Sequence, residues 1–140
     1  MTQVHILVTA CSALAILTII VGIRMLYVRV REMKTRKIKP QMVALSAQRT
    51  GTFQDSRASD NYNHLFELPT LFYVLCILAI STQHIPSWLP ILACLFAVSR
   101  IIHSTIQCTY NRVMHRFFIF IVGLVLLTAM WLGYWFSYIG

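Results

Sequence analysis

The sequence contains few charged residues and almost no acidic ones. Only four of its 140 residues are Asp or Glu, and charged residues make up 11% of the chain. A soluble domain carries roughly 25% charged residues. Hydrophobic residues account for 58% of the sequence instead. This shortage of charge excludes an ordinary soluble domain and indicates a membrane protein.

Metal ligands and disulfide patterns are also lacking. The four cysteines lie in or beside hydrophobic runs: Cys11, Cys76, Cys94 and Cys108. Their spacing matches neither a zinc motif nor a disulfide framework, so we expect small buried hydrophobic side chains. Carboxylates are scarce, and His103 and His115 have no local ligand spacing. No metal site is therefore predicted.

Four hydrophobic runs approach or exceed the roughly 20 residues that cross a bilayer as a helix. They cover residues 4–28, 65–83, 88–107 and 117–139. No alternating pattern of about ten residues suggests a β-barrel. The first run lacks the basic start and the cleavage site of a signal peptide, so we expect it to be retained. The prediction is an all-α, integral membrane four-helix bundle, with a single domain over residues 1–140.

The basic residues are absent from three places: the start of the chain, the turn between the second and third runs, and the end of the chain. All twelve Lys and Arg lie at the end of the first run, in the connection 29–63, or around the third-to-fourth turn. The positive-inside rule places these regions in the cytoplasm and both termini on the non-cytoplasmic side. We expect no nucleic-acid binding, because no recognisable motif accompanies the positive charge.

The 29–63 connection is too long to be a bare loop in a compact bundle. We expect the first helix to continue toward Pro40 and a further helical piece near residues 42–49. Asp60 or Asn61 is the predicted cap of the second membrane helix. Pro69 is expected to kink that helix in an early turn.

Glu67 is the only acidic residue within a hydrophobic run. A carboxylate there is costly in lipid and needs a cationic or hydrogen-bonding partner. Asn63 precedes it by four residues, so the two side chains would share one face of a continuous helix. In one interpretation Glu67 forms a structural ion pair with Arg100.

Arginines outnumber this single carboxylate at the same end of the bundle. Arg100 and His103 stand three residues apart on the third helix, and Tyr110, Arg112 and Arg116 follow in and after the next turn. Arginines at helix ends often reach toward the interface without further function. As a set, however, the unneutralised guanidiniums favour an anionic ligand, and Glu67 could receive its amino group. An amino acid or a small peptide conjugate fits this description.

Three motifs carry a resemblance to a known family: Asp60-Asn-Tyr-Asn63-His-Leu-Phe-Glu67-Leu-Pro69, Arg100-Ile-Ile-His103, and Tyr110-Asn-Arg112-Val-Met-His-Arg116. Their order and spacing resemble the membrane-associated proteins in eicosanoid and glutathione metabolism (MAPEG), particularly bacterial members. The resemblance implies a homotrimer in a bacterial inner membrane that binds glutathione between subunits, toward the cytoplasm. It assigns glutathione binding to Arg31, Asn63, Glu67, Arg100 and His103. Catalysis would use Tyr110 and either Arg112 or Arg116 at the thiolate.

Two functions remain open at this point. The first is glutathione-dependent transfer to a lipophilic electrophile entering from the bilayer, or reduction of a lipid hydroperoxide at the same site. The alternative is a non-enzymatic trimeric membrane protein that binds an anionic lipid or an accessory partner at the same basic residues. A transporter is disfavoured, because the sequence shows no repeat and no pair of broken helices.

Overall fold

The computed structural model describes residues 2–140, and helices are its only regular elements over this range. The long helices are α1 (Gln3–Thr35), α4 (Leu68–Ser81), α5 (Leu89–Cys108) and α6 (Val113–Ile139). Three short ones connect α1 to α4: η1 (Pro40–Val43), α2 (Ser46–Thr52) and α3 (Arg57–His64). Four helical stretches are long and apolar enough to cross a membrane, with α3 and α4 counted together. The prediction of an all-α fold with four such stretches is confirmed.

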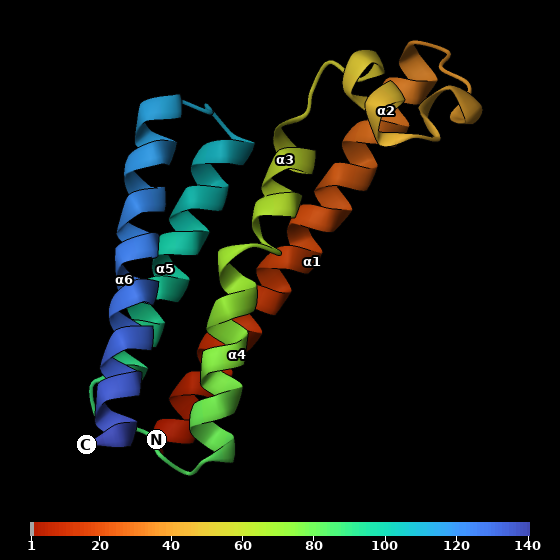
Figure 1. Ribbon diagram of the computed structural model, residues 1–140. Helices are drawn as coiled ribbons and strands as arrows, with labels where there is room; N and C mark the ends of the chain where they lie inside the picture. Colours follow the sequence, from red (N-terminus) through yellow and green to blue (C-terminus); the bar gives the residue numbers. More distant parts are fainter. Residues whose placement is uncertain (1) are drawn as a thin grey trace.

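Helix α5 lies at the centre of the bundle and packs against both α1 and α6 (Figure 1). Fully buried side chains from several helices fill the core, among them Leu14, Phe72, Phe96 and Met130. The rings of Phe72 on α4 and Phe96 on α5 stack with their centroids 4.8 Å apart. Both termini lie at one end of the bundle, and the α5–α6 turn lies at the other, as does the α1–α3 connection (Figure 1).

The first helix extends well beyond residues 4–28 and ends at Thr35. The expected continuation toward Pro40 is therefore largely present, and the chain then forms η1 and α2. Glu32 ties this connection to α1, since its Oε1 accepts hydrogen bonds from Arg36 at 2.7 Å and from the backbone N–H of Gln54 at 2.8 Å. The α2 region consequently lies against the end of α1 (Figure 1).

The second membrane helix was predicted over 65–83 with a kink at Pro69, and the structure shows a full break just before this proline. Helix α3 ends at His64 and α4 begins at Leu68. Pro69 stands in the first turn of α4, where its missing N–H and its ring prevent the helix from continuing smoothly. The prediction that Asn63 and Glu67 share one helical face is therefore wrong, because the break separates them.

Smaller predictions were also corrected. Helix α3 starts at Arg57, so neither Asp60 nor Asn61 caps it, and α6 starts at Val113, before the expected residue 117. All four cysteines are free thiols. Cys76 and Cys108 are buried as expected, whereas Cys94 is exposed on the surface of α5.

Candidate functional site

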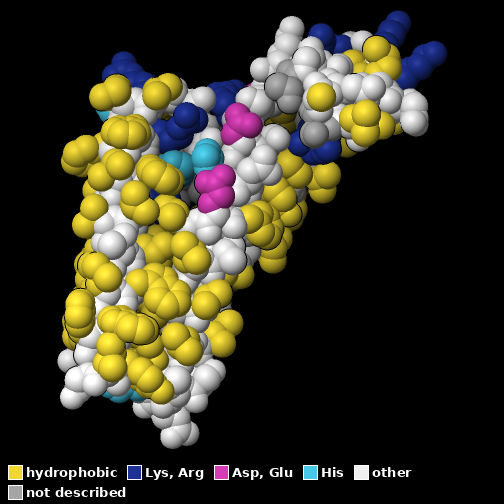
Figure 2. Space-filling view, viewed as in Figure 1, with side chains coloured by type: hydrophobic (Ala, Val, Ile, Leu, Met, Phe, Trp, Pro, Cys, Tyr) yellow, Lys and Arg dark blue, Asp and Glu magenta, His cyan; other side chains and the backbone are white. Residues whose placement is uncertain are grey.

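Basic, acidic and histidine side chains gather in a hollow near the end of the bundle opposite the termini (Figure 2). The hollow lies between the α3–α4 stretch and the α5–α6 pair, and hydrophobic side chains cover most of the surface below it (Figure 2). The clustering follows from topology, because the break after α3, the last turns of α5 and the start of α6 all meet at this level of the bundle.

Glu67 is exposed and pairs with His64, whose Nδ1 lies 2.8 Å from the Glu67 Oε2 atom. The two residues flank the break between α3 and α4. The ring of His64 in turn meets that of His103 edge-on, with centroids 6.0 Å apart. The ion pair between Glu67 and Arg100 is not formed, so Glu67 remains accessible beside a histidine.

Arg100 is only 3% exposed and has no carboxylate partner among the described residues. Its Nη2 donates to the carbonyl oxygen of Ile119 at 3.0 Å. The guanidinium carbon lies 5.5 Å from the ring centre of Phe96 and 5.8 Å from that of Phe120. Such contacts with aromatic faces stabilise a buried cation. The positive charge is thus held inside the bundle without being neutralised.

Gly123 makes room for this guanidinium. A Cβ atom at position 123 would lie 2.6 Å from the Arg100 Cζ, closer than real side chains come. Gly123 was not among the predicted site residues. Its position was nevertheless informative, because glycine in the middle of an apolar helix lowers helix stability and usually has a packing reason.

His103 lies three residues after Arg100 on α5 and is 4% exposed. Its ring centroid is 6.3 Å from that of Phe120 on α6. His103 therefore connects the exposed pair of His64 and Glu67 with the buried surroundings of Arg100. Of the predicted binding residues, a single chain thus brings together Glu67, Arg100 and His103, and His64, which was not predicted, joins them.

The α5–α6 turn carries the predicted catalytic residues. Asn111 adopts a left-handed backbone conformation, with φ of 47°, which asparagine tolerates better than most residues. Its Oδ1 accepts a hydrogen bond from the Arg116 Nη1 at 3.1 Å, and Arg116 is half-buried. Arg112 is exposed at the start of α6, and the Tyr110 hydroxyl lies 3.4 Å from the Nδ1 of His115.

A buried polar contact between α3 and α5 was missed. Asn61 is fully buried, donates to the Cys108 Sγ at 3.3 Å and accepts from the Ser104 hydroxyl at 3.1 Å. Asn63, the predicted ligand residue, is instead exposed. The helical spacing of Ala58, Asn61 and Leu65 could have distinguished them, because it puts Asn61 on the apolar face of α3.

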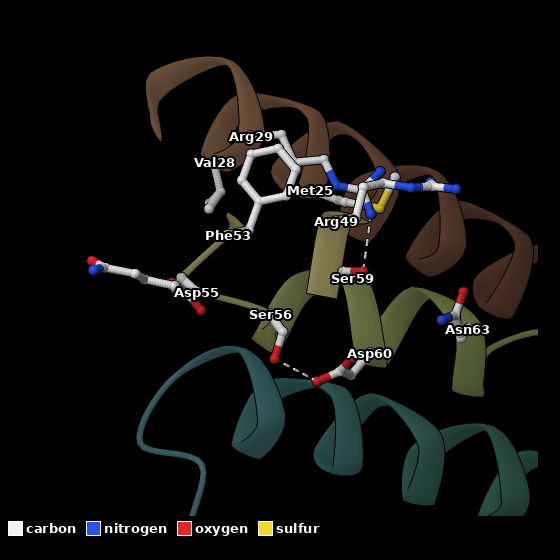
Figure 3. A pocket seen from close by; sticks show the side chains of 11 residues that line it. Met25, Val28, Arg29, Arg49, Phe53, Asp55, Ser56, Ser59, Asp60 and Asn63 are labelled. Atoms are coloured by element: carbon white, nitrogen blue, oxygen red, sulfur yellow. Dashed lines mark hydrogen bonds between the residues drawn. The ribbon is translucent and has the colours of Figure 1, made fainter. Parts of the chain in front are cut away.

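Two of the predicted residues lie on the α1 side of the molecule. Asn63 lines a cavity of about 590 Å³ between α1, the α2 region and α3 (Figure 3). Arg31 lines a smaller cavity of about 200 Å³ with Glu32 and Asp55. Neither lining includes Glu67, Arg100 or His103, nor any of the three residues near the α5–α6 turn. Within one chain, the predicted set is thus divided between two regions.

No group of three His, Cys, Asp or Glu side chains able to hold a metal ion occurs among the described residues. The site consists of guanidiniums, imidazoles, a carboxylate and a phenol. These groups suit a ligand that carries both anionic groups and an amine, because guanidinium binds carboxylate and carboxylate binds ammonium.

Comparison with curated proteins and with solved structures gave no significant match. The family model described as "MAPEG family" matches residues 7–135. This match covers nearly the whole chain, including the break after α3, Arg100 with His103, and the α5–α6 turn. The protein therefore belongs to the MAPEG family and is an integral, multi-pass membrane protein.

Proposed function

We propose that the protein is a membrane-bound, glutathione-dependent transferase or peroxidase that acts on lipophilic substrates from the bilayer. The family includes glutathione transferases and peroxidases. Within this proposal the protein is a homotrimer in a bacterial inner membrane, and its site opens toward the cytoplasm. Glutathione is a co-substrate. The second substrate is either a membrane lipid or a lipophilic molecule dissolved in the bilayer.

The observation that carries the proposal is the buried, unneutralised guanidinium of Arg100 beside His103. Holding a cation in an apolar region costs free energy, and such residues usually mark a functional site. A carboxylate of glutathione would supply the missing negative charge. Glu67, which is exposed and paired only with a histidine, would accept the ammonium group of the same peptide.

The thiol of glutathione must lose its proton to react, because the thiolate is the nucleophile. A nearby guanidinium favours the thiolate over the thiol. We assign this role to Arg116 rather than Arg112, since Arg116 is half-buried and held by Asn111. The Tyr110 hydroxyl would donate a hydrogen bond to the sulfur, and the proton would leave to solvent.

Two reactions fit this arrangement. In transfer, the thiolate attacks the electrophilic carbon, an S–C bond forms, and a leaving group such as halide departs. In reduction, a lipid hydroperoxide accepts two electrons from two glutathione molecules and gives the alcohol, water and glutathione disulfide. Exposed Phe66 and Phe117 near the hollow offer apolar contact for the lipophilic substrate.

A neighbouring subunit would complete the site. Arg31 and Asn63 lie on the α1 side, away from Arg100 and His103. In a trimer, the α1 side of one chain would meet the hollow of the next and bring Arg31 to the peptide. Positioning by residues from two chains would then contribute much of the rate gain.

The test is conjugation of glutathione to an electron-poor aromatic halide by the purified protein. We expect turnover in the wild type and a gain in thermal stability on adding glutathione. Glu67→Gln should weaken glutathione binding roughly tenfold, the effect of losing one charged hydrogen bond. Binding heats measured by calorimetry give this value.

Glu32→Gln is the matched control, because it removes a carboxylate whose contacts lie in the α1–α2 connection. It should bind glutathione as the wild type does. Light scattering on the same samples reports the number of subunits. If the wild type neither turns over nor is stabilised by glutathione, the proposal is wrong.

A further inference from the structure

The larger cavity lies outside the proposed glutathione residues, apart from Asn63 at its edge. It measures about 590 Å³, within the range of small-molecule sites. Its lining is of mixed character, with Met25, Val28 and Phe53 beside charged and polar groups (Figure 3). A cavity with this lining suits a ligand that has a polar head next to an apolar part.

Two arginines border this cavity without a carboxylate partner among the described side chains. Among the described residues, the Arg29 side chain donates only to the hydroxyl of Ser59, at 3.0 Å, and its Cζ lies 5.8 Å from the ring centre of Phe53. The Nε of Arg49 is buried and has no hydrogen-bond partner among the described residues. Unpaired guanidiniums on two helices leave donors free for an anion.

Two carboxylates share the cavity, and they are not equivalent. Asp55 is held by Arg57 in a two-point contact, with both N–O distances 2.9 Å. This hydrogen bonding lowers the pKa of Asp55, so its carboxylate stays ionised, and the guanidinium of Arg57 already neutralises its charge. Within the described part of the chain, the Asp60 side chain accepts only from the Ser56 hydroxyl, at 2.7 Å, and forms no ion pair. One carboxylate is therefore free to meet a cation.

The cavity also lies where α1 changes from apolar to basic. Met25 and Val28 line it, and Arg29 starts the basic run of the chain. The apolar part of a ligand in the cavity would therefore contact Met25 and Val28, next to the guanidinium of Arg29.

We propose that this cavity binds a phosphate ester that carries an amine, of the phosphoethanolamine type, with Arg29 and Arg49 on the phosphate and Asp60 on the ammonium. A phosphate presents oxygens in several directions and can accept from both guanidiniums at once. The source is either phosphatidylethanolamine of the membrane or a soluble phosphoethanolamine ester. Of the proposed glutathione residues only Asn63 lines this cavity, and none of the variants below changes it, so the two proposals can fail independently.

The experiment compares retained lipid by native mass spectrometry after reconstitution in phosphatidylcholine discs with added phosphatidylethanolamine or phosphatidylglycerol. We expect about tenfold preference for phosphatidylethanolamine in the wild type, the effect of one charged contact. Asp60→Asn should abolish that preference, whereas Arg49→Gln should lower the retention of both lipids, because both carry the phosphate. Lys34→Gln is the control, since it removes a basic residue of α1 that does not line the cavity.

Soluble phosphoethanolamine provides the second arm. If it raises the thermal stability of the wild type but not of Asp60→Asn, the proposal holds for a soluble ester; retention of the lipid alone assigns the site to the membrane. Equal retention of both lipids, or a similar loss in Lys34→Gln, would overturn it. So would loss of glutathione binding in Arg49→Gln together with loss of lipid. Circular dichroism confirms that each variant keeps its helices.

Discussion

Arg100 illustrates how a single residue can be kept charged inside an apolar bundle. Its guanidinium donates to the carbonyl of Ile119 and lies near two aromatic rings. Gly123 supplies the space on α6. Burial without these contacts would cost several kcal/mol. The arrangement therefore depends on a residue that carries no functional group.

Replacing Gly123 with Ala should displace Arg100, because the new Cβ would lie 2.6 Å from its Cζ. We expect the free energy of unfolding to fall by about 1–3 kcal/mol, as for other overpacked positions. Glutathione binding should weaken as well. Unfolding in detergent and calorimetry measure the two effects.

Gly51→Ala is the control, since no atom lies within 4 Å of a Cβ at that position. A second comparison places Gly123→Ala in an Arg100→Met background, where the guanidinium is gone. The stability loss should shrink there. An equal loss in both backgrounds would show that Gly123 does not act through Arg100.

The break between α3 and α4 affects the site more than any other feature of the helices. Pro69 cannot donate to the Leu65 carbonyl, and proline disfavours helical conformation in the residue before it. The chain passes from His64 to Leu68 through three residues outside regular helix. This break sets His64 and Glu67 side by side at the edge of the hollow.

Replacing Pro69 with Ala should allow α3 and α4 to join, since residue 69 would then donate to the Leu65 carbonyl. Hydrogen exchange of the backbone amides of Phe66, Glu67 and Leu68 should slow. Pro90→Ala is the matched control, because Pro90 occupies the same early position in α5, where no helix precedes it. Unchanged exchange in Pro69→Ala would mean that packing, rather than the proline, imposes the break.

At the scale of the whole molecule, the two ends of the bundle differ in charge. The end with both termini carries no Lys or Arg, whereas the other end holds the basic connection and the α5–α6 turn. Large apolar side chains are exposed along α1, α4 and α6, as is typical of surfaces that meet lipid or another subunit. The hollow with its polar side chains is at the basic end (Figure 2).

This charge difference predicts the orientation in the membrane. Alkaline phosphatase fused after Gly140 should be active in bacterial cells, because the enzyme folds only outside the cytoplasm. A fusion after Arg112, in the α5–α6 turn, should be inactive. The reverse pattern would place the hollow outside and contradict a cytoplasmic source of glutathione.

Much of the fold could be read from the sequence because a bilayer constrains it strongly. Hydrophobic length predicted the four helical stretches. Local side-chain choices were less accessible: Asn63 was predicted as the ligand residue, and the apolar spacing that puts Asn61 on the buried face applies only to a helix that begins at Arg57 and ends at His64. The partner of Glu67 was equally hidden, because a histidine three residues earlier was as available as Arg100 on another helix.

The sequence by itself determined that the chain is all-helical with four stretches able to span a membrane, that its basic residues collect at one end, and that its arginines outnumber its acids. These properties depend on composition and order along the chain. Only the tertiary structure decided that Arg100 is buried against Gly123, that Glu67 stays accessible beside His64, and that two unpaired arginines meet Asp60 around one cavity. The surroundings of Arg100 and the cavity depend on residues far apart in the sequence, whose distances are set by how the helices pack. The pairing of Glu67 with His64 depends on the break between α3 and α4, which turns these two neighbouring side chains toward each other.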